Sequence, residues 1–405
     1  MKKILFRVIQ KILFLGSLLL PWKEPALLID KGSIKGLAEI IRKDGFSSCL
    51  IVTDKILMKL NLLRPLFDSL DREGVKYELY DETLANPTLE NVEEALRLYT
   101  EKGCQAIIAF GGGSPMDCAK GVGARIARPK KKIEDMRGYI KVMKKPPALY
   151  AVPTTAGTGS EATITAVFTN VKTHEKFAVS DPYLRPKYAV LDPELTVSLP
   201  PHITSITGMD ALTHAVEAYI GHSNTKSTKE YALKAVKLIF ENIEKAYEEG
   251  EDITARQNML VASYLAGLAF TRAYIGYAHA IAHSLGGIYK TPHGLANAVL
   301  LPEVIEFYGK TAHKKLAQLA DAAGLDTGRK TVGEKAQLFI DSVRGLNERL
   351  NISSKLDIIK REDIPLIAKR AYKEASPTYP VPRILKTEEL EDIIYRISSL
   401  PKIDK

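Results

Sequence analysis

Cysteine and tryptophan are scarce in this chain, whose 405 residues include three cysteines and one tryptophan. The cysteines, Cys49, Cys104 and Cys118, are odd in number and do not have the spacing of metal-binding motifs. A disulfide framework and a cysteine-based metal site are therefore not expected. Because unpaired cysteines are typical of proteins from reducing compartments, we expect a cytoplasmic location.

An uncharged apolar run long enough to span a bilayer is also missing near the N-terminus, where the longest such stretch covers residues 12–22. No small-residue cleavage site follows it, as a secretion signal would require. On a helical projection two opposite faces separate, one with Lys3, Arg7, Gln10 and Lys11 and the other with Ile4, Leu5, Ile9, Ile12, Leu13 and Leu19. We expect residues 1–26 to form an amphipathic helix packed against the body or a sister subunit. The alternatives are a peripheral contact with a membrane surface and a secretion signal.

The charge balance does not indicate a nucleic-acid partner. The formal net charge is +9, from 57 Lys and Arg against 48 Asp and Glu, and part of the excess lies in a lysine-rich stretch at residues 130–145. No basic motif interleaved with aromatic residues accompanies this stretch. We interpret it as a solvated loop and expect no nucleic acid to bind.

Strand-like and helical patterns alternate from residue 27 to residue 200. The predicted strands are residues 49–53, 75–80, 105–110, 148–153 and 188–191. This alternation predicts an α/β domain, Rossmann-like, with a parallel sheet covered by helices on both faces. After Pro200-Pro201, amphipathic helical patterns dominate, so we expect residues 201–405 to form an all-helical domain.

A glycine-rich turn follows the third predicted strand. Gly111-Gly112-Gly113 leads into Ser114, Pro115 and Asp117, which suit the N-cap, the first helical position and a capping box. The amide groups of such a helix start can hold a pyrophosphate. The usual Gly-x-Gly-x-x-Gly fingerprint is absent, so a tight turn without a ligand is the alternative for this motif alone.

A second small-residue loop, Pro153 to Glu161, follows the next strand and is expected at the same carboxyl edge of the sheet, where open α/β sheets bind ligands. Asp54 ends the first predicted strand and can accept hydrogen bonds from a ribose diol. Its charge would repel a 2′-phosphate, which favours NAD over NADP. A helix cap explains Asp54 equally well.

One carboxylate and several imidazoles in the second half suggest a divalent metal site. Asp210 and His214 are four residues apart, so both side chains lie on one face of a predicted helix. His279 and His283 have the same spacing, and His293 follows in a loop next to Pro292. The spacing leaves open which of His279 and His283 is a ligand.

Taken together, these motifs resemble the iron-containing (group III) alcohol dehydrogenases, which are related in fold to glycerol dehydrogenase and dehydroquinate synthase. The resemblance covers nearly the whole chain from about residue 25, and its motifs are Thr53-Asp54-Lys55, Asn86-Pro87-Thr88, Gly111 to Ser114, Pro153 to Glu161, Gly208 to Glu217 and His279 to His293. It implies a metal held by Asp210, His214, His279 and His293. His283 then remains as a non-ligand catalytic histidine that relays a proton.

The same resemblance implies the cofactor contacts. Gly112, Gly113, Ser114 and Asp117 would cradle the pyrophosphate, Thr154, Thr155 and Thr158 would line the cofactor cleft, Asp54 would contact the ribose, and Lys176 would reach the cofactor. The implied metal is Fe(II), with zinc as the alternative, and a homodimer is expected.

The expected function is hydride transfer between NAD(H) and a small alcohol or aldehyde. A polyol or hydroxyacid dehydrogenase of the same fold is the nearest alternative. A cyclase resembling dehydroquinate synthase would need a pocket rich in lysine and arginine, for which the sequence shows no pattern. A membrane-surface binding protein that retains the fold is the alternative from another class.

Overall fold

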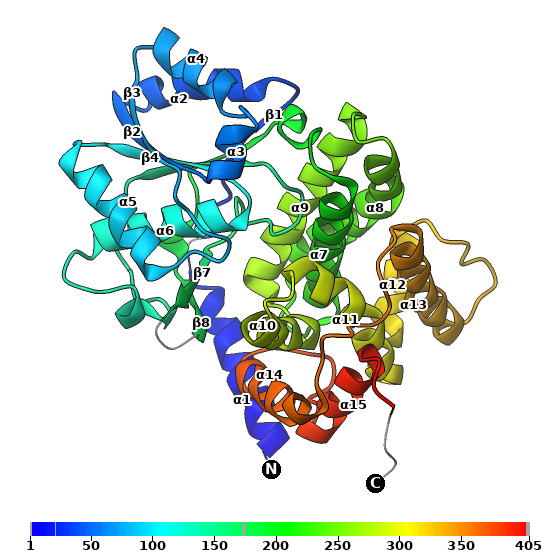
Figure 1. Ribbon diagram of the computed structural model, residues 1–405. Helices are drawn as coiled ribbons and strands as arrows, with labels where there is room; N and C mark the ends of the chain where they lie inside the picture. Colours follow the sequence, from blue (N-terminus) through cyan, green and yellow to red (C-terminus); the bar gives the residue numbers. More distant parts are fainter. Residues whose placement is uncertain (1, 21, 172–174, 402–405) are drawn as a thin grey trace. The chain divides into compact units, whose positions relative to one another are not determined.

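The computed structural model describes residues 2–20, 22–171 and 175–401 and divides into two compact units. The helical unit comprises residues 1–20, 199–250 and 265–405, and the sheet unit comprises residues 21–198 and 251–264. Both units are therefore assembled from segments that are distant in the sequence (Figure 1). The three-part division at residues 26 and 200 stays a prediction.

A parallel sheet with the order β1-β9-β6-β4-β2-β3 forms the centre of the sheet unit. Its strands are β1 (Ala26–Ile29), β2 (Ser48–Val52), β3 (Lys76–Tyr80), β4 (Ala106–Gly111), β6 (Ala148–Pro153) and β9 (Tyr188–Leu191). Gly111 at the end of β4 is paired with Pro153 at the end of β6. This register places the two loops that follow these strands next to each other.

Helices cover both faces of this sheet, as predicted from the alternating sequence pattern. Along β2, Leu50 and Val52 belong to one hydrophobic cluster, whereas Cys49 and Ile51 belong to a second one. Because successive side chains of a strand point to opposite faces, both faces are buried. The helices of this unit are α2 (Leu37–Lys43), α3 (Lys55–Lys59), α4 (Arg64–Arg72), α5 (Leu89–Glu101), α6 (Gly113–Ala127) and the first part of α9 (Ile253–Ala273), with 3-10 turns at Ser33–Gly36, Glu134–Met136, Pro182–Leu184 and Pro193–Thr196.

Four short strands were not among those predicted. The edge strand β1 is only partly buried, so its sequence lacks the hydrophobic density of the central strands. A separate small sheet has the order β5-β8-β7, where β5 is Gly138–Tyr139, β7 is Thr165–Asn170 and β8 is Glu175–Ser180. Strands β7 and β8 are antiparallel, whereas the sequence predicted only a parallel sheet.

The described part of the helical unit contains helices and turns and no strand, as expected for this half of the chain. Its helices are α1 (Lys2–Ser17), α7 (Pro201–Ile220), α8 (Lys226–Glu248), the end of α9 (Ile253–Ala273), α10 (Tyr277–Tyr289), α11 (His293–Phe307), α12 (His313–Ala322), α13 (Val332–Arg349), α14 (Ile364–Ala375) and α15 (Thr387–Ile397), with 3-10 turns at Gly309–Thr311 and Arg361–Asp363. Among the described residues, no single helix has the length and apolar composition to cross a membrane. The pair α9 and α10 meets these criteria only when both helices are counted together across a bend of 102°.

Two polar side chains attach the N-terminal helix α1 to the rest of the helical unit. Gln10, only 5% exposed, donates from Nε2 to the carbonyl oxygens of Pro377 (2.9 Å) and Tyr379 (2.8 Å). Arg7 donates from Nη2 to the carbonyl oxygen of Pro382 at 3.0 Å. A helix packed against the body agrees with the expectation, but it ends at Ser17 instead of residue 26. Its inner face combines Gln10 with the half-buried Phe6 and Phe14, whereas most of its aliphatic residues face outward.

Candidate metal site and cofactor loops

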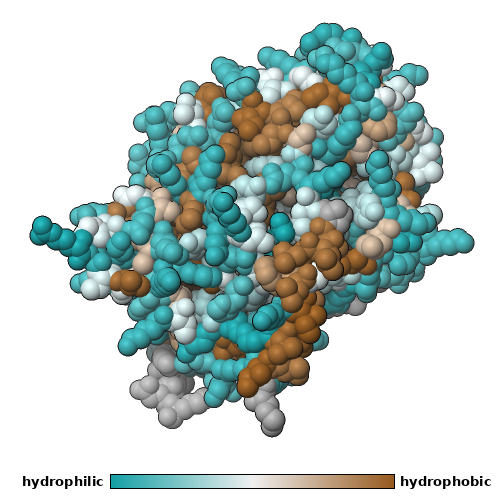
Figure 2. All heavy atoms as spheres, turned by 180° about the vertical axis from the view of Figure 1, so that it is seen from behind, coloured by the Kyte–Doolittle hydropathy of each residue, from teal (hydrophilic) through white to brown (hydrophobic). Residues whose placement is uncertain are grey.

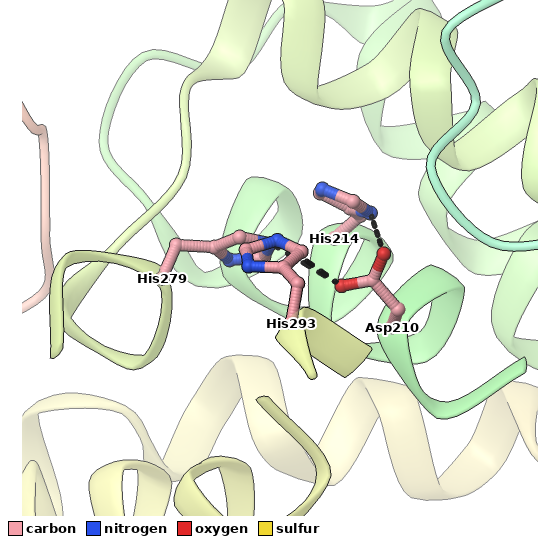
Figure 3. Close-up of side chains that lie close together, drawn as sticks. All are labelled: Asp210, His214, His279 and His293. Atoms are coloured by element: carbon pink, nitrogen blue, oxygen red, sulfur yellow. Dashed lines mark ion pairs between the residues drawn. The ribbon is translucent and has the colours of Figure 1, made fainter. Parts of the chain in front are cut away.

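Asp210, His214, His279 and His293 come together in the helical unit (Figure 3). Asp210 and His214 lie on α7, His279 lies on α10, and His293 is the first residue of α11. Each offers one ligand atom, and these atoms all lie within 4.8 Å of one another. The carboxylate is at the centre: Asp210 Oδ1 is 3.6 Å from His293 Nε2 and 3.8 Å from His279 Nε2, and Oδ2 is 4.0 Å from His214 Nδ1.

The chemistry of this cluster fits a divalent metal ion. Asp210, His214 and His279 are buried, whereas the His293 side chain is 38% exposed, which leaves one side of the cluster open. His279 Nε2 is buried without a hydrogen-bond partner. Burial and the nearby imidazoles of His214, His293 and His283 hold the pKa of His279 well below its usual value. The ring is therefore neutral, the form in which imidazole binds Zn²⁺, Fe²⁺ and related ions.

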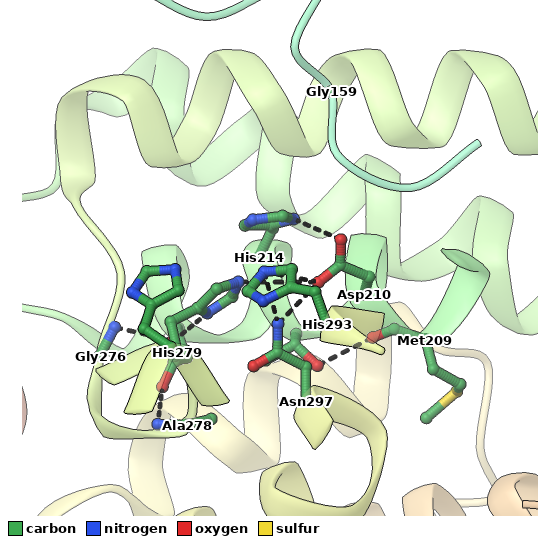
Figure 4. Close-up of polar contacts among 12 residues, drawn as sticks. Gly159, Met209, Asp210, His214, Gly276, Ala278, His279, His293 and Asn297 are labelled. Atoms are coloured by element: carbon green, nitrogen blue, oxygen red, sulfur yellow. Dashed lines mark hydrogen bonds and ion pairs between the residues drawn. The ribbon is translucent and has the colours of Figure 1, made fainter. Parts of the chain in front are cut away.

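A buried glutamate fixes the orientation of His279. Glu217 Oε2 lies 2.6 Å from His279 Nδ1, and the Glu217 carboxylate also accepts hydrogen bonds from the amides of Gly276 (2.7 Å) and Ala278 (2.8 Å). If Nδ1 carries the proton, Nε2 is left with a lone pair for the metal. A Cβ atom at Gly276 would lie 2.6 Å from Glu217 Oε1, so this close approach requires glycine. Gly276, Ala278 and His279 are labelled in Figure 4, where dashed lines mark their hydrogen bonds.

Asn297 connects two of the four cluster residues. Its Nδ2 donates to Asp210 Oδ1 at 2.7 Å and lies 3.1 Å from His293 Nε2, as Figure 4 shows. Because Asn297 stands four residues after His293 on α11, its amide lies over the same helical face. The amide therefore orients Asp210 and His293 relative to each other.

We predict that Glu217→Gln weakens metal binding about 10- to 100-fold, because glutamine keeps the shape of the side chain but loses the negative charge that orients His279. The affinity can be measured by competition with a chelator of known metal affinity. Glu241→Gln on the exposed side of α8 is the matched control and should bind metal as the unchanged protein does. Equal affinities of the two variants would contradict the role of Glu217.

His283 lies outside the four-residue cluster but next to it. Its ring is stacked on His293, with 5.2 Å between the ring centroids. His283 Nδ1 is 2.7 Å from Glu374 Oε1, which also accepts a hydrogen bond from the Tyr379 hydroxyl at 2.9 Å. The structure thus offers a carboxylate that can hold the proton on Nδ1 of His283 and leave Nε2 for proton transfer.

In the sheet unit, helix α6 begins two residues earlier than predicted. The N-cap is Gly112, not Ser114, and Gly113 rather than Pro115 is the first helical residue. Glycine is required just before this helix start, because Gly111 adopts a φ of +145° and a Cβ atom there would lie 2.7 Å from Pro115 Cγ. No side chain of the described residues caps this end of α6. Its first amides can therefore bind an anion, as in other helix N-termini that hold phosphates.

The threonine loop after β6 lies directly beside this helix start. A Cβ atom at Gly112 would lie 3.3 Å from Thr155 Oγ1, and one at Gly113 would lie 3.0 Å from Thr158 Cγ2. Thr154 is buried, and its amide donates to the carbonyl oxygen of Gly111 at 3.2 Å. The structure therefore brings together the two loops that the sequence placed at one sheet edge.

Asp117 and Lys120 brace the threonine loop from α6. Asp117 accepts hydrogen bonds from Ser160 Oγ (3.1 Å) and the amide of Val167 (3.0 Å), and burial raises its pKa to about 6. Lys120, 1% exposed, donates from Nζ to the carbonyl oxygen of Ser160 at 2.8 Å. Burial lowers its pKa to about 8. The bonds of Asp117 position the loop, and none of them involves the amides at the start of α6.

Lys176 reaches the glycine turn through Asn86. Lys176 Nζ donates to Asn86 Oδ1 at 2.6 Å, and the Asn86 amide donates to Ser114 Oγ at 3.1 Å. Burial lowers the pKa of Lys176. Asp54 caps α3, because its Oδ1 accepts from the amides of Ile56 (2.9 Å) and Leu57 (3.0 Å). The helix-cap explanation of Asp54 is thus correct, and a ribose contact through its second oxygen stays a prediction.

Comparison with known proteins identifies the family. Residues 25–193 match the family model for iron-containing alcohol dehydrogenase, and residues 204–398 match the model for the C-terminal part of the Fe-containing alcohol dehydrogenase family. The chain belongs to the iron-containing alcohol dehydrogenase family. It is an NAD-linked oxidoreductase of the alcohol dehydrogenase class, and the fold predicted from the resemblance is confirmed.

The relatives are similar over most of their length. Alcohol dehydrogenase 4 of Schizosaccharomyces pombe is 38% identical over 352 residues, which are 86% of this chain and 82% of that protein. The NAD-dependent methanol dehydrogenase of Bacillus methanolicus is 34% identical over 372 residues, covering 91% of this chain and 97% of its own. The crystal structure of a 1,3-propanediol oxidoreductase superposes with a TM-score of 0.90 at 34% identity, covering 93% of this chain and 99% of that one.

Proposed function

We propose that the chain catalyses reversible hydride transfer between a small alcohol and NAD, with Asp210, His214, His279 and His293 as the four metal ligands. The observation that carries this proposal is the convergence of their ligand atoms within 4.8 Å. Holding one carboxylate and three imidazoles so close is costly unless a cation binds among them.

A divalent metal bound there supplies Lewis-acid polarisation of the substrate oxygen. The chain's own residues do the remaining work. Glu217 holds the neutral His279 ring in place, and Phe270, stacked on His214 with centroids 4.2 Å apart, covers the cluster with an apolar surface. His283, oriented by Glu374, accepts or returns a proton at Nε2 as alcohol and aldehyde interconvert.

Fe(II) is proposed over zinc because all four positions of the family's ligand set are filled, although imidazole and carboxylate bind either ion. NAD is proposed over NADP because the Asp54 carboxylate would repel a 2′-phosphate. The NAD-dependent methanol dehydrogenase of Bacillus methanolicus supports the same choice. We further propose that the chain forms a homodimer. We also propose a cytoplasmic location, because the three cysteines are free and buried.

Removal of the metal tests this function. Protein depleted of metal by a chelator should lose alcohol oxidation with NAD, and anaerobic addition of Fe(II) should restore it more fully than Zn²⁺. Initial rates of NADH formation with short alcohols, diols and hydroxyacids would separate the proposed activity from the polyol and hydroxyacid alternatives. The ratio of kcat/KM for NAD and NADP tests the cofactor choice. Activity that does not respond to depletion would refute the metal's role.

A further inference from the structure

Helix α1 exposes an apolar strip on the side that points away from the helical unit. The strip consists of Ile4, Leu5, Val8, Ile12, Leu13 and Leu15 on α1 and of Leu18 and Leu19 in the turn that follows it, all of them exposed. Ile4 is 70% exposed, Ile12 62% and Leu19 88%. Figure 2 shows the strip as a continuous apolar band over this helix. Single exposed apolar residues are ordinary on protein surfaces, but a continuous row indicates an interaction site.

The hydrogen bonds that attach α1 to the helical unit explain why this strip faces outward. Gln10 and Arg7 make hydrogen bonds to carbonyl oxygens of Pro377, Tyr379 and Pro382, and the half-buried Phe6 and Phe14 lie on the same side of the helix. Rotating the strip inward would break these bonds and leave the carbonyl oxygens of Pro377, Tyr379 and Pro382 without these donors. The outward orientation is therefore built into the packing of α1.

The charged residues of α1 all have one sign. Lys2, Lys3, Arg7 and Lys11 lie on α1, and the first acidic residue of the chain is Glu24. Beside the first turn of α1, a cavity of about 280 Å³ is lined by Lys2, Lys3 and Lys386 together with Glu388. Three cationic side chains against one carboxylate favour an anionic group at this position.

We propose that α1 docks this protein on the surface of a bilayer that contains anionic phospholipids. The apolar strip enters the boundary between acyl chains and headgroups, and the lysines pair with lipid phosphates, which is the arrangement of interfacial helices. The 16 residues of α1 rise only about 24 Å, less than the ~30 Å hydrocarbon core. Since α1 is also held to the helical unit in its middle, it lies along the surface.

A second copy of the chain fits this face less well. A two-fold interface brings the same surface of both subunits together. Two α1 helices joined through their strips would place lysines near lysines, and neither helix has a carboxylate to pair with them. Anionic lipid supplies the missing opposite charge.

Binding to vesicles tests the proposal. The full chain should sediment with vesicles of phosphatidylcholine containing about one third phosphatidylglycerol, and Trp22, the chain's one tryptophan, should shift its fluorescence to the blue. Ile4→Glu/Ile12→Glu should weaken the partition coefficient at least about 100-fold, because two apolar contacts are lost. Lys3→Gln/Lys11→Gln should weaken it about 30-fold on these vesicles and leave any binding to pure phosphatidylcholine unchanged.

The control variant is Leu60→Glu/Val332→Glu, two apolar residues with similar exposure, 53% and 52%, on α3 and α13. It should bind vesicles as the unchanged protein does. Circular dichroism and the thermal midpoint, which do not depend on enzymatic activity, report whether each variant folds. The proposal is overturned if the unchanged protein ignores anionic vesicles or if Ile4→Glu/Ile12→Glu binds them equally well. It is also overturned if this variant dissociates a dimer in the absence of lipid, which would identify a second copy as the occupant.

Discussion

Replacing His279 with alanine is expected to abolish stoichiometric metal binding and to lower alcohol oxidation at least about 10³-fold. The variant loses a buried ligand whose Nε2 lies 3.8 Å from Asp210 Oδ1 and has no hydrogen-bond partner. Lewis-acid polarisation contributes several kcal/mol to such reactions, and each 1.4 kcal/mol corresponds to about a factor of ten. Metal content after anaerobic loading with Fe(II) and initial rates with NAD measure the two effects separately.

His283→Ala is the informative partner of this variant. His283 is stacked on His293 and bound to Glu374, outside the cluster, so its loss should leave the metal in place and lower the rate about 10²- to 10⁴-fold, the usual contribution of proton transfer by a side chain. His202→Ala, an exposed residue of α7, controls for the removal of a histidine as such. If His283→Ala loses the metal and His279→Ala keeps it, the assignment of the two residues is reversed.

The central part of the fold could be predicted because its signal is local. The buried strands β2, β4 and β6 are short apolar runs, and helix α5 has both a regular apolar face and a capping box between Thr88 and Asn91. The β7–β8 pair was missed although three of the six residues of each strand are apolar, and the two strands pair with each other rather than with the main sheet.

The metal cluster could be predicted for a similar reason. Asp210 and His214 are one helical turn apart, and the resemblance supplied the choice of His279 over His283 that spacing left open. Two further polar contacts had readable signals: Glu217 stands seven residues after Asp210 on the same helix, and Asn297 stands four residues after His293. Glu374 had no such signal in the sequence, because its contact with His283 joins residues 91 positions apart.

The orientation of α1, in contrast, could not be predicted from the sequence. Its amphipathic pattern predicted a helix correctly, but the pattern alone cannot say which face a helix buries when polar side chains find specific carbonyl partners. Gln10 satisfies two such partners at once. Each hydrogen bond contributes about 1 kcal/mol, and an unsatisfied buried partner costs more. The three-dimensional arrangement of residues 377–382 therefore decided the orientation.

Gly294→Ala is expected to disrupt the metal site without changing a ligand. A Cβ atom at Gly294 would lie 2.2 Å from the carbonyl oxygen of Ile206 and 2.8 Å from its carbonyl carbon. Both are backbone atoms of α7, so the clash can be relieved only by moving α11 away from α7. These helices carry His293 and Asp210, whose ligand atoms are 3.6 Å apart. We expect a loss of about 1–3 kcal/mol in the free energy of unfolding and about 10²-fold in activity.

Gly287→Ala makes the same chemical change at a position where it should do no harm. Gly287 lies on α10, the helix of His279, and a Cβ atom there would meet no heavy atom within 4 Å. Alanine has a higher helix propensity than glycine, so this variant should be as stable as the unchanged protein or more stable by up to about 1 kcal/mol. It should also bind the metal fully. Urea unfolding and metal titration of both variants provide the comparison. A Gly294→Ala protein that matches Gly287→Ala in metal affinity would show that the spacing of α7 and α11 does not control the site. If only Gly294→Ala loses metal affinity, glycine is required next to His293, because the carbonyl group of Ile206 on α7 occupies the place that a side chain at residue 294 would need.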